Sequence, residues 1–219
     1  TADDNIQEAS RSFNESVALN ASSSVAWNAL GTALNELEDY DGALQAFEQA
    51  VTLDDSISES WYNIGNVQRN LNHNEDALTS YGKAFAIDPQ PRVYNSKGMA
   101  LMQLGRNEDA IEAFDAGLQL ESGLATLWYN KAGALTNLGR YDQGLEAVEK
   151  ALELDSAYEA ATALKEQITR LQSGDAASAG DETVTPDESV VGTGNDESAE
   201  NTSSDFSFSS PDDEGGDQE

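Results

Sequence analysis

Four stretches decide the fold: WNALGTAL at residues 27–34, WYNIGNVQ at 61–68, YNSKGMAL at 94–101 and WYNKAGAL at 128–135. Each begins with an aromatic residue, and successive starts lie 34, 33 and 34 residues apart. Self-similarity at a fixed period of about 20–50 residues is the sequence signature of a repeat architecture. The sequence therefore predicts an array of similar units.

The second half of each unit keeps the same register. A small residue, a large apolar residue and a second small residue recur at helical spacing, as in Ala43, Phe47 and Ala50. Turn-forming residues such as Gly105-Arg106-Asn107 separate the two halves; glycine suits a left-handed helix end, and Asn or Asp suits the next N-cap. Each unit is predicted to be two antiparallel helices of about 13–15 residues.

The pattern resembles the tetratricopeptide repeat family. Its Trp–Leu–Gly phrase, its Ala–Phe–Ala phrase and its period all match, and Pro89 stands where the family has a closing proline. Lys97 and Lys131 replace an apolar residue and Ala132 replaces a glycine, which we expect to weaken individual units. The resemblance covers about residues 3–172. It implies an all-α fold, a right-handed α-α superhelix of helix-turn-helix repeats.

The register divides the chain into a leading half unit, complete units and a cap. The half unit, 3–20, is a second helix whose first helix is missing. The complete units span 24–57, 58–90, 91–124 and 125–156, and residues 157–172 resemble the family's terminal capping helix.

Residues 173–219 have a different composition. They hold 14 of the 41 acidic residues and no Lys or Arg, and their only large apolar residues are three valines and two phenylalanines. Such a segment cannot bury enough apolar surface to offset its ordering entropy, so we predict a disordered acidic tail. One hypothesis is that Phe206-Ser207-Phe208 docks on the concave face of the array; the alternative is a solubilising tail.

The formal net charge of −30 argues against nucleic-acid binding and against anionic membrane surfaces. High solubility and a salt-rich cytoplasm are two explanations of this charge. No apolar run reaches the roughly 18–20 residues of a membrane helix. His73 is the only histidine, cysteine is absent, and no calcium-loop, nucleotide-binding or hydrolase motif is present. We therefore predict no enzyme activity, no cofactor and no metal.

The resemblance implies that the first helix of each unit lines a concave groove that binds an extended peptide or a partner's helix. Helix geometry selects the residues opposite the buried stripe. Asparagine amides can pair with a peptide backbone, Tyr and Met offer apolar contact, and Arg69 and Arg92 favour a carboxylate-bearing partner. The predicted groove residues are Asn28, Thr32, Asn35, Tyr62, Asn66, Arg69, Arg92, Asn95, Met99, Met102, Tyr129, Gly133 and Thr136.

Alternative interpretations stay open at this stage. The truncated first unit also fits an accessory region of a larger enzymatic or membrane-anchored protein. The charge alone would fit an acidic mimic of nucleic acid. The set that clamps a carboxyl terminus in some family members is incomplete, because Asn63 and Arg92 fit but Asn28, Thr32 and Ser96 depart. The compartment is undecided, with a lean to the cytoplasm; sequons at Asn14, Asn20 and Asn201 would matter only after export. The sequence indicates no oligomeric state.

Overall fold

The computed structural model describes residues 2–173 together with Val184 and Pro186. The described residues form ten helices and no strand, so the predicted all-α superhelix is confirmed. The helices are α1 (Ala2–Leu19), α2 (Ser24–Glu36), α3 (Tyr40–Leu53), α4 (Ser58–Asn70), α5 (Asn74–Ile87), α6 (Pro91–Gln103), α7 (Asn107–Leu120), α8 (Ala125–Asn137), α9 (Tyr141–Leu154) and α10 (Glu159–Ser173).

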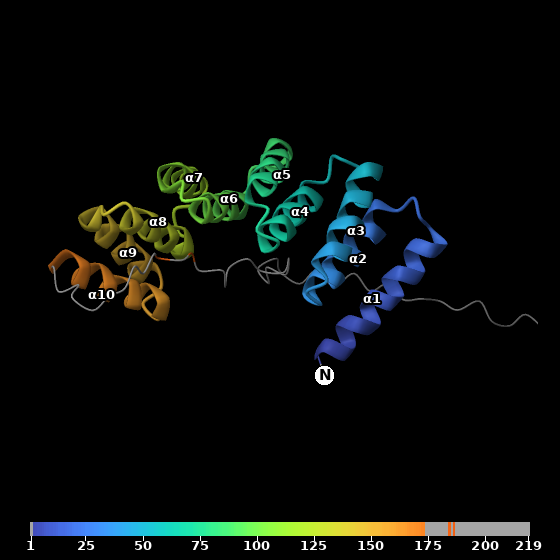
Figure 1. Cartoon of the computed structure of the whole chain (residues 1–219), viewed down its shortest axis with the longest axis horizontal. Helices are drawn as coiled ribbons and strands as arrows, with labels where there is room; N and C mark the ends of the chain where they lie inside the picture. The colour runs from blue at the N-terminus through green and yellow to red at the C-terminus, as the bar shows by residue number, and fades with distance from the viewer. Residues whose placement is uncertain (1, 174–183, 185, 187–219) are drawn as a thin grey trace, which may run out of the picture.

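The helices pack in consecutive pairs, α2 with α3, α4 with α5, α6 with α7, and α8 with α9. At the two ends, α1 packs on α2 and α10 packs on α9. The ribbon follows an arch (Figure 1). Across units, α2, α4, α6, α8 and α10 contact one another in turn, whereas no contacts join the second helices among the described elements. The first helices therefore lie on the inside of the curve.

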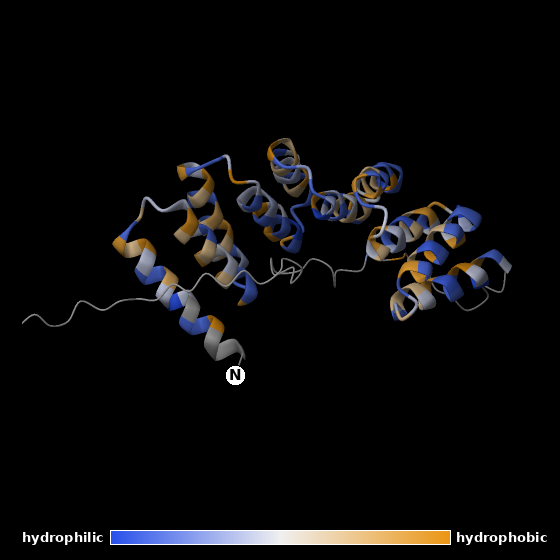
Figure 2. Ribbon diagram, turned by 180° about the vertical axis from the view of Figure 1, so that it is seen from behind, coloured by the Kyte–Doolittle hydropathy of each residue, from blue (hydrophilic) through white to orange (hydrophobic). Residues whose placement is uncertain are grey.

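Within three of the pairs, a glycine on the first helix faces an aromatic ring on the second. A Cβ atom on Gly31 would lie 2.7 Å from the ring of Phe47, and one on Gly65 would lie 2.5 Å from the ring of Tyr81. Both rings are fully buried. The missing side chain is what lets these helices approach. Each helix of the array is amphipathic, with hydrophobic and hydrophilic residues on the same ribbon (Figure 2).

In the pair α8–α9, different residues stand at the glycine position and at the aromatic position. Ala132 stands at the glycine position and Val148 at the aromatic position, and both are fully buried. The smaller valine leaves room for the alanine methyl group. The substitution that the sequence suggested would weaken this unit is therefore matched by a compensating change across the helix pair.

The turn inside each unit contains one residue in the left-handed region. These residues have φ between 60° and 73°, and they are Glu38, Asn72, Gly105 and Gly139. The expected N-caps are only partly right. Asp39 accepts a hydrogen bond from the Gly42 amide at 3.1 Å, but Asn74 and Asn107 are the first residues of α5 and α7 and do not cap them. His73 and Arg106 precede those helices and make no side-chain cap.

Indole groups tie three of the junctions between units. Trp27 donates its Nε1–H to the Ala21 carbonyl at 2.9 Å. Trp61 makes the same bond to Asp55 at 2.9 Å, and Trp128 makes it to Ser122 at 3.0 Å. The α5–α6 junction has Tyr94 at this position and two prolines, Pro89 and Pro91, in and after its loop.

The C-terminal end of the array is covered by α10. At the C-terminal end, α10 packs against α9 through buried Ala161, Leu164 and Ile168. Ser173, which we expected to begin the tail, is the last residue of α10. The rest of the predicted tail, including Phe206-Ser207-Phe208, lies outside the described residues except for Val184 and Pro186.

The boundaries of the repeats stay a prediction from register. Among the described helices, none has the length and apolarity needed to cross a bilayer.

Candidate functional site

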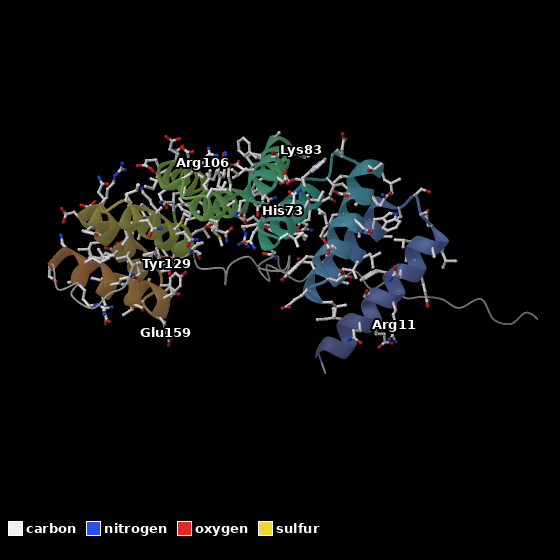
Figure 3. The ribbon with its side chains drawn as sticks, in the orientation of Figure 1. Arg11, His73, Lys83, Arg106, Tyr129 and Glu159 are labelled. Atoms are coloured by element: carbon white, nitrogen blue, oxygen red, sulfur yellow. The ribbon has the colours of Figure 1, made fainter. Side chains whose placement is uncertain are left out.

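The candidate site is the surface of α2, α4, α6 and α8 on the hollow side of the arch, which we call the inner face. The four helices contact one another in series along it. Tyr129 lies on this side in Figure 3, whereas Lys83 and Arg106 lie on the outer side. The predicted site residues all come from these four helices.

On α4, predicted site residues form a buried polar network with α5. The Tyr81 hydroxyl donates a hydrogen bond to Asn66 Oδ1 at 2.9 Å. Burial raises the pKa of this hydroxyl above its ordinary value, and the neighbouring Arg69 guanidinium acts in the opposite direction. Tyr62, Asn66 and Arg69 are only 3%, 8% and 3% exposed. These three residues stabilise the floor of the inner face, and little of their surface is available for contact.

Arg92, at the start of α6, already has acceptors within the chain. Its guanidinium pairs with the Glu59 carboxylate, donates a hydrogen bond from Nε to the Gln90 side-chain oxygen at 2.7 Å, and stacks over the Tyr62 ring at 4.8 Å from the centroid. The side chain of Arg92 is 38% exposed. A carboxylate-bearing partner would therefore have to exchange with Glu59, which the sequence did not reveal.

Between α6 and α8 the inner face is closed by side chains. Asn130 donates to Asn95 Oδ1 at 2.9 Å, and the Asn95 amide lies 3.6 Å from the Met99 sulfur. Met99 is fully buried and Met102 is nearly so. The sequence predicted that Met99 and Met102 offer adaptable apolar contact to a partner, but both side chains are buried between helices.

The remaining predicted residues are less enclosed at the N-terminal end. Asn28 accepts a hydrogen bond from Ser60 at 3.0 Å, and Thr32 donates to the Asn28 carbonyl at 3.1 Å. Asn28, Thr32 and Asn35 are partly exposed. At the other end, Thr136 is buried and donates to the Ala132 carbonyl at 2.7 Å.

The inner face of α8 carries a feature that the sequence reasoning missed. The Asn137 side-chain amide donates to the Val184 carbonyl at 3.1 Å, and its oxygen accepts the Val184 N–H at 2.9 Å. Both polar backbone atoms of one residue are therefore bound by one side chain. Val184 also packs against the cluster that contains Tyr129 and Leu135.

A signal for this position was present in the register. Each complete unit ends its first helix with a polar residue at the same place, and these are Glu36, Asn70, Gln103 and Asn137. On α8 this position is Asn137, which lies four residues after Gly133 on the same face of the helix. His73, the single histidine, is exposed in its turn. Among residues 2–173, 184 and 186, no group of three or more metal-ligating side chains comes together.

These features define an α-helical repeat protein whose first helices line one continuous surface. The sequence profile of the tetratricopeptide repeat matches residues 2–56, 62–125 and 97–159. The chain belongs to the tetratricopeptide repeat family.

Solved structures share the fold at low sequence identity. MamA is 19% identical with a TM-score of 0.66, and the match covers 69% of this chain and 89% of that chain. YrrB, described as a TPR protein with an unusual peptide-binding site, is 18% identical with a TM-score of 0.62, covering 75% and 86%. The first TPR of Spaghetti (RPAP3), bound to the HSP90 peptide SRMEEVD, is 18% identical with a TM-score of 0.52, covering 55% and 96%. A comparison with curated protein sequences found no match.

Proposed function

We propose that this protein is a non-catalytic interaction scaffold that binds an extended segment of a partner protein on its inner face. The carrying observation is the pair of hydrogen bonds between the Asn137 amide and the backbone of Val184. A primary amide both donates and accepts, so it can pair with the backbone of any residue that has a free N–H. This is the chemistry needed to recognise a peptide in trans.

Two structural relatives support the proposal. One is described with a peptide-binding site and another is bound to a peptide. On this chain, the partly exposed Asn28, Thr32, Asn35 and Arg92 supply further polar groups along the inner face. Arg92 gives the surface a preference for a carboxylate that can replace Glu59.

The chemistry of the described residues also supports a binding role. Active sites concentrate groups with strongly perturbed pKa values. In the described part of the chain, the pKa of Tyr81 is raised inside the core and the pKa of Asp54 is lowered by hydrogen bonds from Ser56 in an interhelical turn. Tyr81 is bonded to Asn66 inside the core, and Asp54 accepts its hydrogen bonds from Ser56 within a surface turn.

The test is a selection of random 12-residue peptides on the full chain, followed by affinity measurements on two triple variants. Asn28→Ala/Asn35→Ala/Arg92→Ala alters partly exposed residues of the inner face. Lys83→Ala/Arg106→Ala/Lys150→Ala, the matched control, alters exposed residues on α5, before α7 and on α9, which do not belong to the inner face. We expect selected peptides to lose about tenfold or more in affinity on the inner-face variant, as for substitution of central contact residues.

Circular dichroism would show that both variants remain helical. Fluorescence polarisation would then compare the peptides. A library that fails to enrich above a blank surface, or peptides that bind both variants equally, would contradict the proposal.

A further inference from the structure

We propose that Val184 is a built-in occupant of the inner face of α8, and that it competes with the partner's peptide for this place. The competition rests on the proposed function, whereas the seating of Val184 does not. The occupant is a segment of the chain itself, so its binding is intramolecular.

The first support is the match of hydrogen-bonding groups. Asn137 lies in the last turn of α8, and its donor and acceptor meet the Val184 carbonyl at 3.1 Å and the Val184 N–H at 2.9 Å. These two bonds fix the register of the segment, because shifting it by one residue would turn the next N–H and C=O away from Asn137. A proline at this place would lack the N–H donor.

The second support is shape. Gly133 lies one helical turn before Asn137, and a Cβ atom there would sit 3.0 Å from Val184 Cγ1 and 3.5 Å from Met102 Cε. The equivalent residues on α4 and α6 are Asn66 and Met99, which have larger side chains, and both are buried. Glycine at 133 therefore opens a notch on α8 that a small branched side chain occupies.

The third support is the length of the tether. Gln172, near the end of α10, donates a hydrogen bond to Asp142 at the start of α9, which follows α8 after a short turn. The last helix thus ends close to Asn137. Ten residues, 174–183, separate α10 from Val184, and a chain of that length reaches at most about 36 Å. Short flexible tethers give effective concentrations on the order of 1 mM, enough for a weak contact to be populated.

These contacts also specify what a competing partner must present. It needs a residue with a free N–H and C=O for Asn137, and a small branched apolar side chain for the notch at Gly133. A valine-containing extended peptide meets both requirements. Large aromatic residues would not fit beside Met102 without displacing it.

The seating is tested by a disulfide in the full chain, which has no cysteine of its own. A Cβ atom at residue 133 lies 3.8 Å from Val184 Cβ, and disulfides have Cβ atoms about 3.8 Å apart. We expect Gly133→Cys/Val184→Cys to cross-link within the chain in a glutathione redox buffer, as seen by gel mobility and intact mass. Gly133→Cys/Val190→Cys is the control, with a similar tether. Cross-linking that is no more favourable than in the control overturns the seating.

The competition is tested with a labelled synthetic peptide of residues 179–190, AGDETVTPDESV. Because the apparent dissociation constant is the intrinsic value divided by the free fraction of the site, we expect Val184→Asp in the full chain to bind this peptide about two- to tenfold more tightly. Asn137→Asp, which turns the donor into an acceptor facing the Val184 carbonyl, should weaken binding of the peptide. Equal affinity of wild type and Val184→Asp overturns the competition.

The two proposals fail in distinguishable ways. If the cross-link forms but no random peptide is selected, the seat is real and the scaffold function is wrong. If random peptides bind the inner face but the cross-link does not form, the scaffold function stands and Val184 is not its competitor.

Discussion

Helices α6 and α8 stand at equivalent places in neighbouring units, yet their glycines differ by one position. Helix α6 carries Gly98-Met99, and α8 carries Ala132-Gly133. Gly98 faces the ring of Phe114 on the paired helix, whereas Gly133 faces Val184 on the inner face. Successive residues of a helix point about 100° apart, so a shift of one residue moves the gap from one face to another. A glycine at the first of these two positions lets the paired helices approach, and a glycine one residue later leaves space on the inner face instead.

The largest expected loss of stability comes from truncating the buried side chain between the two helices of a pair. Phe114→Ala removes a fully buried ring between α6 and α7, and we expect it to lower the free energy of unfolding by about 3–5 kcal/mol. Val148→Ala at the equivalent, fully buried place between α8 and α9 removes less volume and should cost about 2 kcal/mol. Urea unfolding followed by circular dichroism measures both. Equal losses would mean that the two pairs are not packed on the residues named.

A second prediction concerns a double variant in which the α6–α7 pair receives the residues of the α8–α9 pair. Gly98→Ala places a methyl group against the Phe114 ring, and overpacking of this kind costs about 1–3 kcal/mol. Gly98→Ala/Phe114→Val reproduces the α8–α9 combination, so the double variant should cost less than the sum of the single variants. A double-mutant cycle in urea gives the coupling, and strict additivity would show that the glycine and the ring do not compete for space.

The smallest effect is expected at the displaced glycine. Gly133→Ala raises the helix propensity of α8, so the free energy of unfolding should stay constant or rise by up to about 1 kcal/mol. Its methyl group would press on Val184 rather than on the core of the helix pair. Urea midpoints at unchanged slope measure the difference. A loss as large as that of Gly98→Ala would place Gly133 in the core instead of on the inner face.

The sequence register was sufficient to predict the fold. Trp27, Trp61, Tyr94 and Trp128 marked equivalent places, and helical spacing between apolar residues predicted paired helices. The N-caps were less predictable, because Asn74 and Asn107 begin their helices instead of preceding them. A shift of one residue at a helix end changes little in the apolar pattern, so periodicity does not detect it.

The burial of the predicted site residues was harder to foresee than the fold. Helix geometry placed Asn66, Arg69 and Met99 on the first helices correctly, but it did not show that neighbouring helices bury them. Burial depends on side chains from α5, α6 and α8, which a single helical wheel does not contain. Asn137 was missed because it stands at the helix end, beyond the apolar stripe. Its partner Val184 carries no sequence signal that distinguishes it from the other two valines of the acidic segment.

The three indole hydrogen bonds make the tryptophans reporters of particular junctions. Trp27, Trp61 and Trp128 each hold a loop carbonyl six residues earlier, at the α1–α2, α3–α4 and α7–α8 junctions. Opening of one of these loops would expose an indole to water and shift its emission to longer wavelength. The α5–α6 junction has Tyr94 at this position, so tryptophan emission does not monitor it directly. An unfolding curve recorded by fluorescence would therefore follow the α1–α2, α3–α4 and α7–α8 junctions more closely than the α5–α6 and α9–α10 junctions.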